Sequence, residues 1–166
     1  MKKLSLMAVV VLGLFLVSGM AYAEEKYTYV DLGKVFDEYK KTKEYDKVLE
    51  AKQKDFEKKR ETMVGGVKEL QEKMSLLSEE EREARKGELE DKIAKLQEFD
   101  RNETQDLRKQ RDEKVQEIFK DIKGSIDNYS KKQGISLVFD QRALVFHLEQ
   151  MDITEAILSD LNKGKN

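Results

Sequence analysis

The sequence contains no cysteine and no proline, and its only histidine is His147. Without cysteine the chain can form no disulfide, no thiolate nucleophile and no lipid-modified cysteine. With a single histidine, one chain cannot build a histidine-based metal cluster or a Ser-His-Asp relay. The glycine-rich loops of nucleotide-binding proteins are missing as well. We therefore predict that the protein is not an enzyme and that it uses no cofactor and no metal.

Long hydrophobic runs are confined to the N-terminus. Lys2 and Lys3 precede an apolar run over residues 4–17, and Ala21-Tyr22-Ala23 has the small-x-small pattern of a cleavage site. Residues 1–23 therefore read as a secretory signal peptide, cleaved after Ala23, with an uncleaved anchor as the alternative. Beyond residue 23 no run approaches the roughly 18 apolar residues that a membrane span needs. We expect an exported protein that resides in the periplasm.

Charged residues make up 40% of the chain, where about a quarter is usual. This composition favours long, solvated helices over a thick globular core. Residues 44–129 hold no proline, and we predict a long antiparallel helical hairpin there, called the arm, with helices over 43–74 and 79–132. Ser78 and Glu81 form a capping box, which predicts a turn near residues 75–78. The alternative is one uninterrupted helix of about 90 residues in a dimeric rod.

Apolar residues are sparse along the arm, and both seven-residue and eleven-residue spacings fit parts of it. Such a stripe is too loose for a tight coiled coil, so we predict that it binds a protein client by many weak contacts. The alternative is that it only joins the two helices. The residues predicted to contact a client are Phe56, Met63, Val67, Leu70, Met74, Leu89, Ile93, Leu96, Phe99 and Leu107.

Glycines interrupt the arm at two places. Gly65 and Gly66 lie in the middle of the outgoing helix, and pairing about the tip places Gly87 almost opposite, near residue 68. Because each glycine weakens a helix by roughly 1 kcal/mol relative to alanine, we predict a hinge at these three residues. Close packing of the two helices at small residues is the alternative.

Residues 24–43 and 130–166 form the rest of the chain, called the body, and the fold class is α+β. We predict strands over 26–32, 135–140 and 143–148, a short helix after the first strand, capped by Asp31, and a last helix opened by Asp152 and Glu155. A body this small is marginal by itself and favours oligomerisation through its strands. The residues predicted to do so are Tyr27, Tyr29, Val30, Leu137, Phe139, Leu144 and Phe146.

The order of these segments resembles the Skp/OmpH family of periplasmic chaperones. The resemblance rests on Tyr29-Val-Asp-Leu32, Val35-Phe-Asp-Glu-Tyr39, Ile135-Ser-Leu-Val-Phe-Asp140 and the ending from Met151 to Asn162. It implies a jellyfish-like homotrimer whose body strands form a small barrel and whose arms enclose unfolded outer-membrane proteins. It also implies an ATP-independent holdase, a chaperone that prevents client aggregation. The alternative function is a non-catalytic coiled-coil spacer or scaffold of the cell envelope.

Charge separates the chain from the familiar members of that family, which are basic. Without Lys2 and Lys3, 30 of the 32 basic residues remain against 34 acidic ones, so the net charge of residues 24–166 is near −4. The tip, residues 79–91, carries seven acidic residues and three basic ones. We therefore expect no nucleic-acid binding and weak or no binding to anionic membranes.

Overall fold

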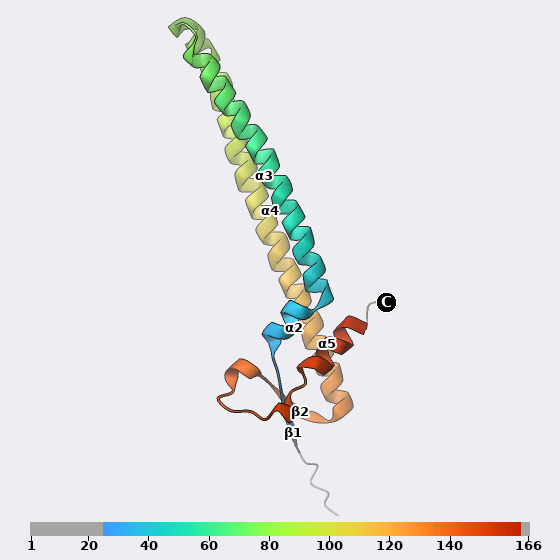
Figure 1. The fold of residues 1–166 in the computed structure, drawn as a ribbon. Helices are drawn as coiled ribbons and strands as arrows, with labels where there is room; N and C mark the ends of the chain where they lie inside the picture. The colour runs from blue at the N-terminus through green and yellow to red at the C-terminus, as the bar shows by residue number, and fades with distance from the viewer. Residues whose placement is uncertain (1–24, 164–166) are drawn as a thin grey trace, which may run out of the picture.

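A computed structural model describes residues 25–163, and the predicted signal peptide lies outside them. A two-helix arm rises from a small body that contains the C-terminal helix (Figure 1). In chain order the elements are β1 (Lys26–Val30), α2 (Leu32–Glu38), α3 (Lys40–Ser75), α4 (Glu79–Gln133), β2 (Ile135–Asp140), the 3-10 turns η2 (Gln141–Ala143) and η3 (Glu149–Met151), and α5 (Thr154–Lys163). No helix within residues 25–163 is long and apolar enough to cross a membrane.

The arm consists of α3 and α4, and it turns back where the capping box predicts. The Ser78 hydroxyl accepts a hydrogen bond from the Glu81 backbone N–H at 3.4 Å, and the Glu81 carboxylate accepts one from the Ser78 N–H at 3.1 Å. The Arg82 guanidinium closes the turn by donating to the carbonyl oxygens of Met74 and Leu77. The interpretation as one uninterrupted helix is therefore wrong, because the tip residues satisfy the ends of two separate helices.

The sheet of the body has two parallel strands, β1 and β2, which the whole arm separates in the sequence. Tyr27 lies opposite Leu137, and Tyr29 lies opposite Phe139. A parallel pair requires a long crossover connection, and here the hairpin arm supplies it.

The predicted strand over residues 143–148 is wrong. The chain forms the turn η2 and then runs irregularly to η3. The side chain of Asp140 causes the turn, because it accepts a hydrogen bond from the Arg142 N–H at 3.0 Å and pairs with the Arg142 guanidinium at 2.7 Å. The segment consequently leaves the sheet, and its alternating apolar residues find no neighbouring strand within the described part of the chain.

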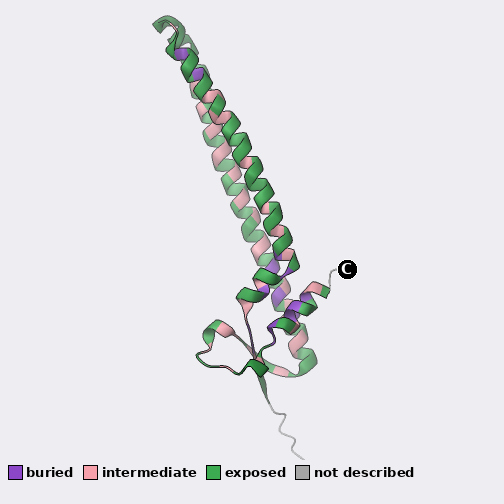
Figure 2. Cartoon of the chain, viewed as in Figure 1, coloured by how far each residue is buried: buried purple, intermediate pink, exposed green. Residues whose placement is uncertain are grey.

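The core lies where α2 and α5 pack on the lower end of α4 (Figure 2). Asp31 caps α2 as predicted, since its carboxylate accepts a hydrogen bond from the Lys34 N–H at 2.9 Å. The most buried core side chains belong to Val30, Val35, Tyr39, Ile118, Ile122, Ile157 and Leu158. A core of this size holds the lower end of the arm, while most of α3 and α4 contact only each other.

Candidate functional site

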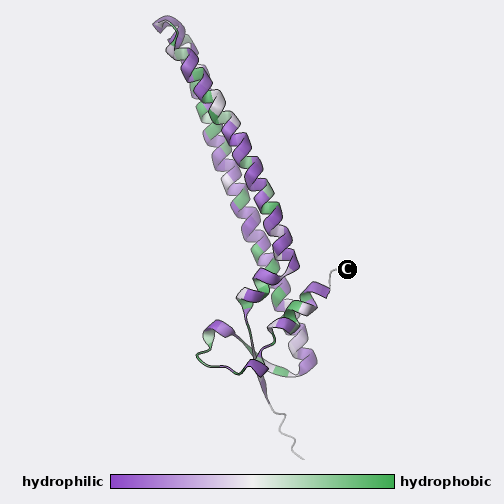
Figure 3. Cartoon of the chain, viewed as in Figure 1, coloured by the Kyte–Doolittle hydropathy of each residue, from purple (hydrophilic) through white to green (hydrophobic). Residues whose placement is uncertain are grey.

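The apolar stripe of the arm lies along the contact between α3 and α4 (Figure 3). Midway along it, the ring of Phe56 stacks on the ring of Phe99, with centroids 5.6 Å apart. Near the tip, Leu70 and Met74 are buried, with only 5% and 7% of their surface exposed. The stripe therefore joins the two helices, and at its upper end it forms a small core of its own.

Most of the stripe is nevertheless only half-buried. A hairpin of two helices cannot enclose side chains that lie between them, because no third helix covers the seam. The residues predicted to contact a client that lie half-exposed are Phe56, Met63, Val67, Leu89, Ile93, Leu96, Phe99 and Leu107. The other two predicted residues, Leu70 and Met74, are buried near the tip. A client could reach them only if the conformation of the tip changed.

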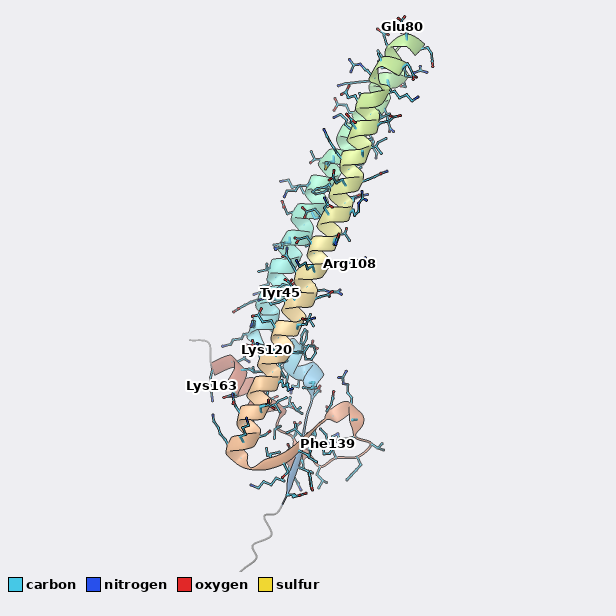
Figure 4. The ribbon with its side chains drawn as sticks, turned by 180° about the vertical axis from the view of Figure 1, so that it is seen from behind. Tyr45, Glu80, Arg108, Lys120, Phe139 and Lys163 are labelled. Carbon is cyan, nitrogen blue, oxygen red and sulfur yellow. The ribbon has the colours of Figure 1, made fainter. Side chains whose placement is uncertain are left out.

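A hollow runs beside the Phe56–Phe99 contact. Its lining includes the apolar residues Leu49, Phe56 and Leu107 and the basic residues Arg108 and Arg111. In Figure 4, Tyr45 and Arg108 lie in this lower part of the arm, on the two facing helices. Apolar side chains and guanidinium groups thus line the same hollow.

Charge surrounds the stripe and is largely neutralised within each helix. Ion pairs spaced four residues apart include Lys54–Glu50, Lys59–Asp55 and Lys73–Glu69, each at 2.7 Å. Exposed pairs of this kind add little stability, because water and salt screen them. Their main consequence is a solvated outer face.

A denser ionic cluster fastens the root of the arm. Lys41 of α3 pairs with both Glu117 and Asp121 of α4, and its distance to Asp121 is 2.5 Å. The hydrogen bonds from Lys114 and Lys41 lower the pKa of Glu117 to about 2. The Tyr39 hydroxyl donates to Asp121 at 3.3 Å. This cluster crosslinks the two helices where they meet the body.

The three predicted hinge glycines lie within regular helix. A Cβ atom added at Gly65 or Gly87 would meet no heavy atom within 4 Å, and one at Gly66 would meet only the Lys92 ammonium at 3.9 Å. Close helix packing therefore does not require glycine at these positions within the chain, and that alternative interpretation is wrong. Gly66 shares a hollow with Glu88, the neighbour of Gly87, so the glycines lie at similar heights on the arm.

The residues predicted for oligomerisation divide into two groups. Tyr29 and Val30 are 2% exposed and belong to the chain's own core, and Leu144 is half-buried. In contrast, Tyr27, Leu137, Phe139 and Phe146 are exposed, and Phe146 has 80% of its surface accessible. The body therefore presents a broad apolar surface, at the opposite end of the molecule from Glu80 at the tip (Figure 4).

Sequence reasoning missed some exposed apolar residues. Val145 is fully exposed and Leu148 is 45% exposed, because residues 144–148 run irregularly and not as a strand with two distinct faces. Leu76 at the tip is 87% exposed. Leu76 is an apolar residue inside the predicted turn, and this position could have indicated its exposure.

His147 packs within the body. Its ring contacts the ring of Tyr29, with centroids 4.3 Å apart. Among residues 25–163, no group of three or more His, Cys, Asp or Glu side chains is arranged to hold a metal ion.

Comparison with known proteins identifies a family for this chain and solved structures of similar shape. Residues 26–161 match the model of the OmpH family, described as outer membrane protein (OmpH-like). A crystal structure from Caulobacter crescentus CB15, of a candidate outer membrane chaperone described as OmpH-like, superimposes with a TM-score of 0.75. The two sequences are 14% identical, and the match covers 89% of each chain. No curated protein matches the chain.

Proposed function

The chain belongs to the OmpH-like outer membrane protein family, and on that premise we propose that it is an ATP-independent holdase chaperone of the periplasm. Its clients are unfolded outer-membrane proteins, which it holds along its arms and keeps from aggregating. It carries out no catalysis. The signal peptide directs its export and is removed after Ala23.

The half-exposed stripe between α3 and α4 is the observation that carries this proposal. Because no third helix covers the seam, side chains such as Phe56, Met63 and Ile93 remain partly accessible and can contact a client. Methionine adapts to many partner surfaces because its side chain is flexible and polarisable. Repeated weak contacts along an arm bind an extended client by avidity, and they release it without ATP when it folds elsewhere.

Oligomerisation through the body supports the same proposal. The apolar side chains of Leu137, Phe139, Val145 and Phe146 are exposed in the single chain, and exposed apolar patches commonly mark protein–protein interfaces. We propose that three copies join at this surface into a homotrimer. Three arms would then surround one space with charged rims and apolar inner walls.

A spacer or scaffold of the cell envelope is the second candidate, and one observation favours it. Leu70 and Met74 are buried between the helices, and Phe56 stacks on Phe99, so part of the stripe serves to hold the arm together. The two functions differ in one respect: a spacer has no need to bind an unfolded chain.

The decisive experiment measures light scattering by an unfolded outer-membrane β-barrel protein diluted out of denaturant without ATP. We expect the full protein, at a several-fold excess, to suppress aggregation. The paired substitution Met63→Gln and Leu96→Gln should weaken suppression while circular dichroism shows the helices intact. The matched control changes exposed residues of the same helices, Lys58→Gln and Gln97→Ala, and should behave as the parent protein. Unchanged aggregation in the presence of the parent protein would favour the spacer.

The acidic tip bears on membrane binding. Glu79, Glu80 and Glu83 extend from the turn into solvent and repel anionic headgroups. We propose weak or no binding to anionic membranes. Strong co-sedimentation with anionic vesicles at low salt would contradict this, and neutral vesicles serve as the control.

A further inference from the structure

The C-terminal helix α5 lies at the root of the arm, where the arm is joined to the sheet. It packs on α2 and on the lower end of α4, and its side chains reach both the end of β1 and the start of α3. We infer that α5 is a clasp that sets the direction of the arm relative to the two-stranded sheet, and that Asn162 is the positioning residue by which it holds α3.

Only two connections join the sheet to the arm. One is the segment of residues 31–39, which contains α2 and ends at a break before α3. The other is Gly134, between α4 and β2, which has a φ of 65° and open space around it. Contacts between the elements on the two sides of these connections therefore contribute to the direction of the arm.

The break between α2 and α3 has no local cause. It falls at Tyr39, whose backbone is extended, yet residues 34–64 contain neither glycine nor proline. Tyr39 is also a poor cap, since its side chain makes no capping hydrogen bond. In an unbroken helix the N–H of Lys40 would donate to the carbonyl oxygen of Phe36. The local sequence is therefore compatible with one continuous helix.

Asn162 takes the place of that carbonyl. Its Oδ1 atom accepts a hydrogen bond from the Lys40 N–H at 3.0 Å. Asparagine is among the best helix N-caps, and here it acts from a helix 122 residues away in the sequence. The cap thus makes the break at Tyr39 depend on the position of α5.

Three further contacts hold α5 in that position. The Thr154 hydroxyl accepts a hydrogen bond from the Asp31 N–H at 2.9 Å, at the junction of β1 and α2. The Asp160 carboxylate accepts a hydrogen bond at 3.0 Å from the hydroxyl of Ser125 on α4. Ser125 is buried, with 6% of its surface exposed. The apolar side chains of Ile157, Leu158 and Leu161 are buried beneath the helix. Together these contacts join sheet, α2 and α4 to one helix.

For the proposed chaperone, on which this consequence rests, the clasp limits how far the arms spread at their roots. While α5 keeps these contacts, the root of each arm keeps one direction relative to the bodies of the trimer. The bending that accommodates larger clients then takes place within the arm itself, on the tip side of the Lys41 cluster.

The clasp is tested by the distance between the sheet and the arm. Because the chain has no cysteine, Lys58→Cys on α3 and Gln150→Cys in η3 accept spin labels at two exposed sites, and pulsed electron resonance reads the distance between them. Labelled protein is refolded with an excess of unlabelled protein so that only distances within one chain are measured. The Asn162→Ala substitution should broaden and shift the distance distribution. Asn162→Asp keeps a capping oxygen and should restore it.

Asn128→Ala provides the matched control, because Asn128 is an exposed asparagine on α4, and it should leave the distribution unchanged. In the Asn162→Ala protein the Lys40 amide should also exchange with solvent about fivefold faster, the order expected for loss of one N-cap. A distribution and an exchange rate identical to those of the parent protein would overturn the inference. Both readouts need no client. A parent protein that fails to suppress aggregation would therefore refute the proposed function and leave the clasp standing.

Discussion

Phe56 of α3 and Phe99 of α4 stack on each other at 5.6 Å, with their ring planes 29° apart. This contact ties together the two helices of the arm at its middle, far from the core of the body. It shows that the stripe has a structural role even where its side chains remain accessible.

The Phe56–Phe99 pair should be energetically coupled. In a double-mutant cycle with Phe56→Ala and Phe99→Ala, we expect a coupling free energy of about 1 kcal/mol, because stacked aromatic pairs contribute beyond their burial. The measurement is urea unfolding followed by circular dichroism. As a control, Phe56→Ala combined with Phe119→Ala should be additive, since Phe119 contacts Phe36 at the root instead. Additivity of the Phe56–Phe99 pair would show that the stacking carries no energy.

Acid should loosen the root of the arm through Glu117. Hydrogen bonds from Lys114 and Lys41 lower the pKa of Glu117 from 4.5 to about 2. Because this pKa is lower in the folded state, its stabilising effect is present above pH 4.5 and is lost as the pH falls toward 2. In Glu117→Gln the melting temperature should therefore fall less over that interval than in the parent protein.

Glu113→Gln is the control for this pH dependence. Glu113 is an exposed residue of the same helix, and its nearest cation, Lys109, lies 4.0 Å away. Its substitution should retain the full loss of melting temperature in acid. If the Glu117→Gln protein also showed the full loss of melting temperature in acid, the Lys41 cluster would not be the source of that loss.

Replacing the hinge glycines should stiffen and stabilise the arm. Gly65→Ala introduces a methyl group into open space, so we expect a gain of about 1 kcal/mol in the free energy of unfolding. Thermal unfolding measures the gain. Gly124→Ala, at an equally open position in the lower part of α4, should give a similar gain.

The hinge itself is tested by the range of tip positions, read from labels on the tip and the body. Gly65→Ala with Gly66→Ala should narrow that range, while Gly124→Ala should leave it alone. An unchanged range in the double variant would refute the hinge and assign these glycines no mechanical role.

Oligomerisation should depend on Phe146. Phe146→Ser removes a side chain that is 80% exposed in the single chain, and it should shift the protein from a trimer toward monomers in sedimentation equilibrium. Leu76→Ser removes an equally accessible apolar side chain at the tip and should leave the mass unchanged. A parent protein that sediments as a monomer would refute the proposed homotrimer.

The sequence by itself determined the elements whose causes are local. The tip follows from Ser78 and Glu81, three residues apart, and the cap of α2 follows from Asp31. The length of both arm helices follows from the absence of proline and the density of charged, helix-favouring residues. In each case the partners lie within a few residues, so the pattern alone predicts the contact.

The tertiary structure decided everything that depends on distant partners. Residues 143–148 alternate like a strand, but the sheet contains only β1 and β2 within the described residues, and the segment turns away after Asp140. Tyr29 and Val30 are predicted for an oligomer surface, yet both are buried within the single chain. Val30 packs in the core with residues of α2, α4 and α5, and Tyr29 packs against His147. The break at Tyr39 depends on Asn162. Hydrogen bonds between segments a hundred residues apart leave no local pattern, and so only the folded chain shows which of them form.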